Sequence, residues 1–390
     1  MITLARNKGT DILSATMPRE ALESHKGAPV KVSVIVPVYN AEELVGDTLR
    51  SIQQQTLQDI EIICVNDAST DASLDVLYEH LKEDSRISII DNPHNSGTGT
   101  TINLGLQLAN GSYIQIVGND DLLDHDALEK LYDLCESEHL DFCQYAMRVI
   151  NDDPADEALE KRRDYQENLN RVENGYPILP GAELLSLLAV NREYRMHNGA
   201  QIARKSFLDQ HSIRNLEGIH HEDMYYTYRI LLSAQRATLL PNPFYTYRIR
   251  RNSLESKKTS RTHTSEEFLA LFVSASAMID ATPEELFLSP DYSPVVEQEI
   301  YHYLDMAAKR FASLPPETQN EIRANTKTEQ IVLRGIKLYA AETDRGLSAL
   351  KEMKASTEDR LQRIKASRSY KVGHALLAGP RYVKRLFKRH

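Results

Sequence analysis

The stretch from Lys31 to Asn40, KVSVIVPVYN, constrains the fold more than any other part of this chain. Its β-branched apolar residues do not alternate with polar ones, which is typical of a parallel strand covered by helices on both faces. Pro37 cannot donate to a sheet ladder, so we expect Val38, Tyr39 and Asn40 in the loop at the carboxyl end of the strand. Open α/β sheets bind their ligands at that end.

Strands and helices then alternate, with a period of about 25 residues, as far as residue 117. The apolar pattern predicts strands at residues 60–65, 87–90 and 113–117 and helices at 41–55, 72–83 and 101–110. Asn40 and Glu43 fit a capping box at the start of the first helix. This order predicts an α/β fold with a Rossmann-like, mostly parallel sheet flanked by helices.

The remaining pattern predicts further elements and an overall division of the chain. We expect helices at 126–138, 181–190 and 224–232, strands at 142–149, 197–203 and 243–250, a charged surface excursion at 151–175, and helices almost throughout 265–365. A length of 390 residues indicates two or three domains. We therefore expect an irregular or weakly helical arm at 1–30, an α/β domain at 31–255, an α-helical extension at 256–350 and a basic amphipathic tail at 351–390.

Charge is distributed unevenly along the chain. Residues 360–390 contain ten Lys or Arg and no acidic residue, so the remainder holds 36 of the 46 basic residues and all 56 acidic ones. An acidic body argues against a nucleic-acid partner, whereas the tail suits an anionic surface. We expect neither a membrane span nor a signal peptide. The three cysteines lack metal-ligand spacing and indicate buried, reduced thiols in a cytoplasmic protein.

Polar side chains follow three of the predicted strands at one edge of the sheet. Tyr39 and Asn40 follow the first strand, Asp67 the second, and Asp120 with Asp121 the fourth. One carboxylate can accept hydrogen bonds from a base or ribose, and another can hold Mg²⁺ or Mn²⁺ against phosphate. Taken singly, each loop is better explained as a helix cap or turn. Three such loops in register favour a nucleotide site.

Three segments, in order, carry a family resemblance: VSVIVPVYNAEELVGDTLRSIQQQT, EIICVNDASTD and NSGTGTTINLGLQLANGSYIQIVGNDD. With them, residues 31–255 resemble the catalytic domain of glycosyltransferase family 2, of GT-A fold and bacterial surface-polysaccharide type. The resemblance implies a nucleoside pocket and a metal site. Its nucleotide-binding residues would be Pro37, Val38, Tyr39, Asn40, Asp67 on the base (commonly uracil) and Asn119 near the ribose. Asp120, with Asp121 beside it, would hold the divalent cofactor, Mn²⁺ or Mg²⁺, as the carboxylate of the family's D-x-D motif.

The family's inverting reaction also needs a general base, usually the Asp of an E-D pair that begins a helix. Glu222-Asp223 in GIHHEDMYYTYRI matches that context, so the resemblance makes Asp223 the candidate base, with Glu222 beside it. Acidic residues also favour the first turn of any helix, which remains the alternative explanation. His220 and His221 are candidate contacts to the acceptor or the diphosphate, or exposed loop residues.

Two positions depart from the family pattern. Gly118 stands where the family usually has the first Asp of D-x-D, and Ile102 stands where it often has an arginine that contacts phosphate. Arg148, Arg248 or Arg250 are candidates to replace that arginine. The segment FYTYRIRRNSLES resembles the end of the family's catalytic domain, with aromatic faces suited to a sugar; a core strand with exposed arginines is the alternative.

The end of the chain, SYKVGHALLAGPRYVKRLFKRH, resembles the endings of bacterial polysaccharide glycosyltransferases. Its apolar and basic residues predict an amphipathic helix on the anionic inner face of the cell membrane, or a disordered basic terminus. Residues 337–366 fit either a short coiled coil, which would support a homo-oligomer through C-terminal helices, or a packed helix. These features place the expected enzyme in the cytoplasm, peripherally associated with the membrane.

The resemblance implies an inverting glycosyltransferase. It would transfer a sugar from a nucleotide-diphosphate sugar to a hydroxyl of a bacterial surface glycan or a polyprenyl-linked oligosaccharide. A UDP-sugar is the expected donor. Two alternatives stay open. One is a transferase that decorates teichoic acid or exopolysaccharide without a lipid carrier, and the other is a non-catalytic scaffold that binds nucleotide-sugars.

Overall fold

The computed structural model describes residues 14–16, 29–153, 155–157, 159–161, 163–164, 172, 174–250, 265–287, 289–304, 306–307 and 314–317. The predicted basic tail and the segment 337–366 lie outside these residues. The chain divides into two compact units. Unit 1 comprises Met1–Asn170, His197–Thr227 and Asn242–Thr259, and unit 2 comprises Arg171–Met196, Tyr228–Pro241 and Ser260–His390.

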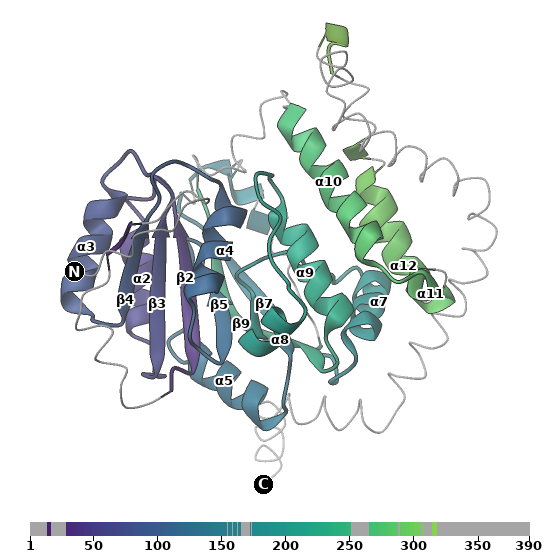
Figure 1. Ribbon diagram of the computed structural model, residues 1–390, viewed down its shortest axis with the longest axis horizontal. Helices are drawn as coiled ribbons and strands as arrows, with labels where there is room; N and C mark the ends of the chain where they lie inside the picture. The colour runs from purple at the N-terminus through teal and green to yellow at the C-terminus, as the bar shows by residue number, and fades with distance from the viewer. Residues whose placement is uncertain are drawn as a thin grey trace, which may run out of the picture. The chain divides into compact units, whose positions relative to one another are not determined.

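A mixed nine-stranded sheet has the order β1-β4-β3-β2-β5-β8-β7-β9-β6 (Figure 1). Its central strands β2 (Val32–Val38), β3 (Ile60–Asn66), β4 (Ile87–Asp91) and β5 (Tyr113–Ile116) are parallel, as predicted. Ile35 in β2 lies opposite both Ile63 and Ile116, so the carboxyl ends of three strands meet at one edge. Residues 32–36 are fully buried, which confirms a strand covered on both faces.

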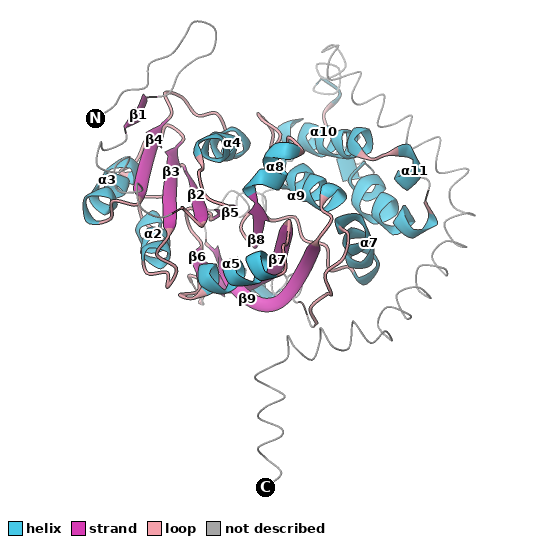
Figure 2. Cartoon of the chain, turned by 60° about the horizontal axis from the view of Figure 1, so that its bottom comes forward, coloured by secondary structure: helices cyan, strands magenta, loops and turns pink. Residues whose placement is uncertain are grey.

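Helices cover both faces of these parallel strands (Figure 2). The helices α2 (Val45–Gln53) and α3 (Ser73–Glu83) lie on one face, and α4 (Thr98–Leu108) lies on the other. The chain steps outward from β2 to β3 and β4, then crosses back to β5 on the far side of β2. Right-handed crossovers in opposite directions place their helices on opposite faces. The reversal between β2 and β5 marks their carboxyl ends as the expected ligand site.

Antiparallel strands extend this parallel core. Three of them were predicted with shifted ends, namely β7 (Phe142–Asn151), β8 (Gln201–Arg204) and β9 (Ala237–Ile249). Two were not predicted, β6 (Leu122–Leu123) and β1 (Ser14–Thr16). The expectation of an irregular or weakly helical arm is wrong at β1, which pairs with β4 in antiparallel fashion. An uncovered β4 would leave a row of unpaired backbone groups at the sheet edge, and β1 satisfies them.

The capping box predicted at Asn40 and Glu43 is also wrong. The first helix begins at Val45 and has no side-chain cap. Asn40 has a left-handed φ of 47°, and its side-chain oxygen accepts the backbone N–H of Thr70 at 2.8 Å. Glu42 accepts the N–H of the residue before α3 at 2.7 Å. The loops after β2 and β3 therefore hold each other, because their polar side chains cross-link the two loops instead of capping their own helix.

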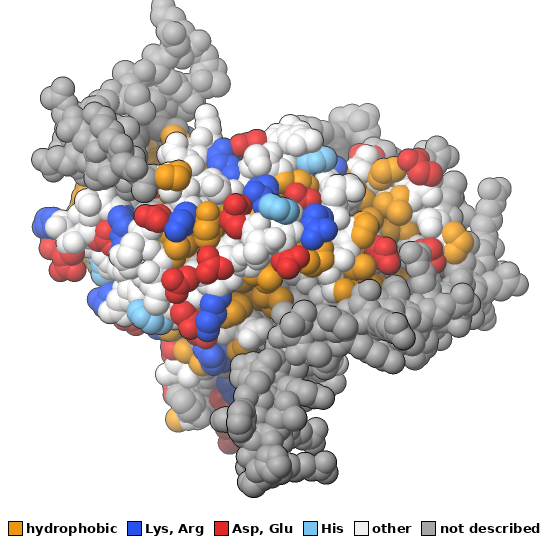
Figure 3. Space-filling view, turned by 90° about the horizontal axis from the view of Figure 1, so that it is seen from below, with side chains coloured by type: hydrophobic (Ala, Val, Ile, Leu, Met, Phe, Trp, Pro, Cys, Tyr) orange, Lys and Arg blue, Asp and Glu red, His pale blue; other side chains and the backbone are white. Residues whose placement is uncertain are grey.

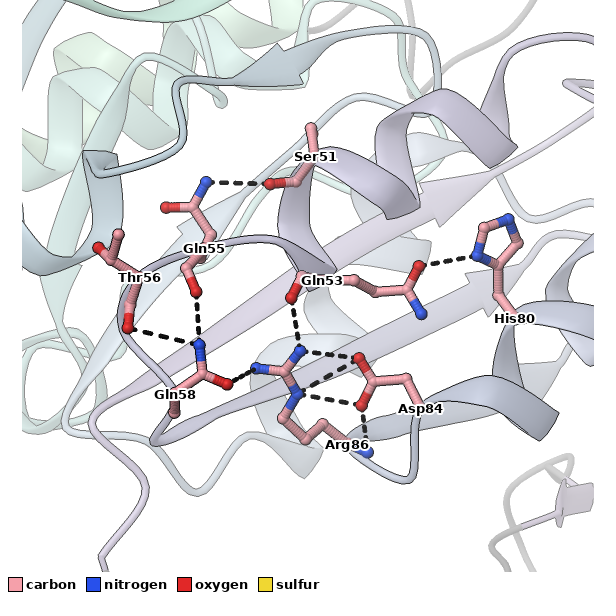
Figure 4. A network of polar contacts seen from close by, with 8 residues as sticks. All are labelled: Ser51, Gln53, Gln55, Thr56, Gln58, His80, Asp84 and Arg86. Carbon is pink, nitrogen blue, oxygen red and sulfur yellow. Dashed lines mark hydrogen bonds and ion pairs between the residues drawn. The ribbon is translucent and has the colours of Figure 1, made fainter.

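A polar network joins the end of α2 to the start of β4 (Figure 4). Arg86 donates to both carboxylate oxygens of Asp84 and, at 2.8 Å, to the carbonyl of Gln53. The Gln53 side chain in turn lies 2.8 Å from Nδ1 of His80. Burial alone would raise the pKa of Asp84, but the hydrogen bonds from Arg86 hold it below its ordinary value. This network fixes the connection between α2 and the sheet.

Unit 2 is helical in its described part beyond residue 265, as the pattern predicted. It contains α7 (Gly181–Asn191), α10 (Ser265–Ala281), α11 (Glu284–Phe287) and α12 (Ser293–Val295), which continues into a π-helical turn at Val296–Tyr301. The buried face of α7 packs against α12. The hydroxyl of Tyr292 donates to that of Tyr228 at 2.7 Å, which ties this region to the second half of α9 (Glu222–Ser233).

On the face shown in Figure 3, acidic and basic side chains are interspersed with apolar ones. Ion pairs between exposed side chains, such as Lys82–Glu79, contribute little to stability.

All three cysteines are buried and form no disulfide, as predicted. None of the helices in the described part of the chain has the length and apolar composition of a membrane span.

Candidate active site

The loops after β2, β3 and β5 bring Tyr39, Asp67 and Asn119 to one edge of the sheet. The expectation that Val38 lies in the loop is wrong, because β2 extends through Pro37 to Val38, which is 1% exposed. The backbone N–H of Asp67 donates to the carbonyl of Val38 at 2.8 Å, which joins the first two loops. Asn119 lies three residues after the end of β5, the neighbour of β2 on the side opposite β3. Tyr39 is 45% exposed although it directly follows Val38, which is 1% exposed. Its ring therefore offers a free face on which a flat base can stack.

Asp67 is buried, and its carboxylate holds the loop that precedes α4. One oxygen accepts hydrogen bonds from the Asn92 side chain at 3.0 Å and from the Ser96 N–H at 2.9 Å. The other accepts the N–H of Gly97 at 2.8 Å. A carboxylate has about four acceptor positions, so one remains for a base. Asp67 thus fixes the start of α4, a role that the sequence alone did not indicate.

Asp121 is engaged on both of its oxygens. The hydroxyl of Tyr245 donates to one at 2.7 Å, and the backbone N–H of Arg248 donates to the other at 2.9 Å. The side chain is buried, and burial together with the charge of Asp120 raises the pKa of Asp121. Contacts with β9 take two of its about four acceptor positions, so Asp121 stays a predicted metal ligand beside Asp120.

The missing carboxylate at position 118 has a steric explanation. A Cβ atom on Gly118 would lie 2.7 Å from the Asp121 carboxylate, closer than real Cβ contacts allow. The N–H of Gly118 donates to the hydroxyl of Tyr245 at 3.0 Å. Glycine at 118 and the bond between Tyr245 and Asp121 therefore belong together, and a side chain at 118 would displace that bond.

Asp120 is the carboxylate of this loop that reaches the surface. Its side chain is 21% exposed and accepts a hydrogen bond from Nε of Arg250 at 3.0 Å. Among the described residues, no three His, Cys, Asp or Glu side chains are grouped to hold a metal ion by themselves. The donor set fits Mg²⁺ or Mn²⁺ when substrate phosphates complete the coordination around Asp120, which is the usual arrangement for Mg²⁺.

The three arginines considered as phosphate partners differ in their surroundings. Arg248 is 10% exposed and lies 3.5 Å from a carboxylate oxygen of Asp47 and 3.6 Å from one of Asp152. Arg148 pairs at 3.0 Å with the aspartate that follows β6. Arg250 is the one of the three paired with Asp120, at 3.0 Å. Its position therefore suits a diphosphate better than the position of Arg248 does.

Glu222 and Asp223 are the first two residues of α9, as the sequence predicted for a base at a helix start. The partial positive charge of the helix N-terminus stabilises carboxylates there. His220 is exposed, and His221 has a left-handed φ of 61° immediately before the helix. The chain therefore turns sharply at His221 into the helix that carries both candidate residues.

The start of α9 lies against the first turn of α4. A Cβ atom on Gly99 would come within 2.3 Å of the Leu216 carbonyl oxygen and 3.3 Å of Cβ of Glu222. Since Asp67 holds the residues just before α4, Glu222 and Asp223 share its neighbourhood. The structure thus brings the predicted general base to the same side of unit 1 as the predicted nucleoside site.

Comparison with known proteins finds a family match over part of the chain. Residues 33–194 match the profile of Glycosyl transferase family 2. The glycosyltransferase EpsH of Bacillus subtilis is 29% identical over 254 residues, which cover 64% of this chain and 69% of that protein. Poly(ribitol-phosphate) beta-glucosyltransferase of Bacillus spizizenii is 37% identical over 125 residues, or 31% of this chain and 20% of that protein.

The fold has a counterpart among solved structures. The crystal structure of S. aureus TarS 1–349 in complex with UDP-GlcNAc superimposes with a TM-score of 0.59 at 21% identity, covering 88% of this chain and 92% of that chain. At this identity the likeness establishes the fold alone. Residues 33–194 are thus similar to glycosyltransferase family 2, and the chain is a glycosyltransferase with the GT-A fold.

Proposed function

We propose that this enzyme transfers a sugar, with inversion, from a UDP-sugar to a hydroxyl group of a bacterial surface glycan or a lipid-linked oligosaccharide. The observation that carries the proposal is the contact of Gly99 with the residues around Glu222, because it joins the loop held by Asp67 to the helix of the candidate base. The likeness to a TarS structure that contains UDP-GlcNAc supports a UDP-sugar as the donor.

In the proposed reaction Asp223 accepts the proton of the acceptor hydroxyl. The acceptor oxygen attacks the anomeric carbon as the bond from that carbon to the diphosphate oxygen breaks on the opposite face. A divalent cation on Asp120 would supply positive charge to the departing diphosphate. Arg250, paired with Asp120 at 3.0 Å, supplies a second positive charge. Tyr39 stacks on the base, and Asp67 has one acceptor position for it.

A donor screen tests the first half of this proposal. Thermal unfolding of the full chain is followed with UDP-, GDP-, dTDP- and CDP-sugars, each with and without Mn²⁺. A ligand that binds only the folded state raises the midpoint, and 100-fold excess over Kd corresponds to about 2.7 kcal/mol. We expect UDP-sugars with Mn²⁺ to raise it. A rise with another nucleotide alone would replace the UDP assignment, and an Mn²⁺ effect that persists in Asp120→Ala would refute the metal site.

A matched pair of variants tests the base. Asp223→Asn is expected to reduce sugar transfer about 10²- to 10⁴-fold while donor binding stays unchanged. Asp75→Asn is the control, because Asp75 is an exposed carboxylate in the first turn of α3 and shares only the helix-start position. Transfer by Asp223→Asn at the rate of the control would show that Asp223 is not the base.

A second acceptor class has support from one relative. The match to poly(ribitol-phosphate) beta-glucosyltransferase favours decoration of a teichoic-acid type of polymer as the alternative function. The two are separated by offering the full chain a poly(ribitol phosphate) polymer and a polyprenyl-linked oligosaccharide in parallel. Labelled sugar on the polymer alone would establish the alternative.

We further propose that the basic residues of 360–390 hold the enzyme on the anionic inner face of the membrane, and that C-terminal helices join two copies. Co-sedimentation of the full chain with vesicles that contain anionic lipid, and not with zwitterionic vesicles, is the expected result. Light scattering measures the mass in solution. A monomer that ignores anionic vesicles would contradict both statements.

A further inference from the structure

Asn103, on α4, grips the backbone of the loop that leads to the candidate base. Its side-chain nitrogen donates to the carbonyl of Asn215 at 2.9 Å, and its side-chain oxygen accepts the N–H of the same residue at 2.8 Å. The nitrogen also donates to a carboxylate oxygen of Glu217 at 3.0 Å. One side chain thus satisfies both backbone groups of Asn215, as a neighbouring strand would.

Gly99 determines how closely the loop that Asn103 holds can approach α4. Gly99 and Asn103 are four residues apart and therefore lie on the same face of α4. A Cβ atom on Gly99 would overlap the Leu216 carbonyl at 2.3 Å, so glycine allows the loop to lie directly on the helix. Asn103 fixes the loop along the helix, and Gly99 fixes how closely it approaches.

The loop needs such external contacts because its own backbone does not favour this path. Within the loop, His221 has a left-handed φ of 61°, a conformation that L side chains rarely adopt. Gly218 has a φ of 70°, which glycine adopts readily. A residue such as His221 keeps its conformation only when surrounding groups stabilise it. The contacts from α4 supply that stabilisation immediately before Glu222.

The same helix begins at the loop that Asp67 holds. Asp67 accepts the N–H groups of Ser96 and Gly97, and α4 starts at the next residue. One rigid helix therefore connects the candidate nucleoside site with the loop of the candidate base. This connection is continuous in the structure, since each contact shares a residue or a helical turn with the next.

We propose that Asn103 is a positioning residue for sugar transfer: it fixes the loop 213–221 so that the first turn of α9 presents Asp223 to the acceptor hydroxyl. The proposal rests on the proposed function, because it assigns Asn103 a role through Asp223. Misplacement of a catalytic group by about 1 Å costs about 10²-fold in rate. Loss of the grip should therefore reduce turnover and leave nucleotide binding intact.

The test compares three variants of the full chain. Asn103→Ala removes all three hydrogen bonds. Asn103→Asp keeps the acceptor for the Asn215 N–H but loses the donor and repels Glu217, so it isolates half of the grip. Gln107→Ala is the control, because Gln107 is exposed one turn further along the same helix. Binding of UDP, turnover of UDP-GlcNAc and UDP-glucose, and amide hydrogen exchange are measured for each.

We expect Asn103→Ala to lower kcat about 10- to 100-fold, with the Kd for UDP within about twofold of the control. Asn103→Asp should fall between the two, and amides of 213–221 should exchange faster in both variants. Unchanged kcat in Asn103→Ala overturns the proposal. So does a parallel loss of kcat, UDP affinity and thermal midpoint, which would make Asn103 a residue of general stability.

Failure of the proposed function has a different signature. If the unmodified chain neither binds UDP nor turns over either donor, the role in sugar transfer fails with the proposed function. Exchange of the 213–221 amides, measured in the same samples, then still reports whether Asn103 holds the loop. Faster exchange in Asn103→Ala would establish the grip without the reaction, and unchanged exchange would overturn the grip itself.

Discussion

Removal of one hydroxyl group, in Tyr245→Phe, tests the arrangement beneath the Asp120 loop. The hydroxyl donates to Asp121 at 2.7 Å and accepts the N–H of Gly118 at 3.0 Å, in a side chain that is fully buried. Burial raises the pKa of Asp121 to about 8, so its carboxyl is mostly uncharged at neutral pH. Loss of a hydrogen bond to an uncharged group costs about 0.5–1.5 kcal/mol, and an unpaired backbone N–H adds about 1 kcal/mol. We therefore expect the free energy of unfolding to fall by about 2 kcal/mol.

Urea unfolding measures this change, and with an m-value of about 2–3 kcal/mol/M the midpoint should fall by about 1 M. Tyr226→Phe is the matched control. Tyr226 is 1% exposed, so its side chain is buried to nearly the same degree as that of Tyr245. Amide exchange should also rise at Gly118 and its neighbours. A destabilisation within about 0.5 kcal/mol of the control would refute the assignment of Asp121 as a residue held by this hydroxyl.

Three other predictions follow from described contacts. Gly118→Asp restores the family's usual residue but should lower the free energy of unfolding by about 3 kcal/mol, because its Cβ meets the Asp121 carboxylate at 2.7 Å; unaltered urea unfolding would disprove this. Asp84 has a folded pKa below its ordinary 3.8, so its contribution to stability is present above that pH and is lost as the pH falls through the folded value. Arg86→Met should weaken this acid-induced loss in urea titrations between pH 2 and 6, whereas Lys82→Met, at an exposed ion pair, should not. The three buried thiols should be inert to Ellman's reagent until urea unfolds the chain, and burial raises the pKa of Cys64 to about 12; a thiol that reacts in the folded protein would contradict its burial.

The parallel core was predictable because its signal is local. The run from Val32 to Val36 is apolar at four of its five positions, and such a run leaves few alternatives to a strand covered on both faces. The position of Glu222-Asp223 at a helix start was predictable for the same reason, since the apolar spacing after it is helical. Short outer strands were not. The three residues of β1 form a strand because they pair with the edge strand β4. The sequence of Ser14–Thr16 alone does not indicate that pairing.

The contacts that organise the site were not predictable, because they join residues distant in the chain. Asn103 and Asn215 are 112 positions apart, and Tyr245 and Asp121 are 124 apart. Polar residues such as Asn40 choose among caps, turns and cross-links according to what folding brings near them. In this chain Asn40 binds the next loop, and its sequence neighbours alone favoured the cap.

The helix α7 has a consequence for synthesis of the protein. Leu184, Leu185 and Leu188 are fully buried, and the helix packs against α12, which lies about 100 residues later in the chain. At a translation rate of about 5–20 residues/s, α12 is synthesised about 5–20 s after α7, and the apolar face of α7 lacks this contact until then. A gene fragment that ends near residue 259 lacks α12, so this face would stay exposed. Such a fragment should be a substrate for chaperones or aggregate, so expression of the full chain is the way to a stable catalytic domain.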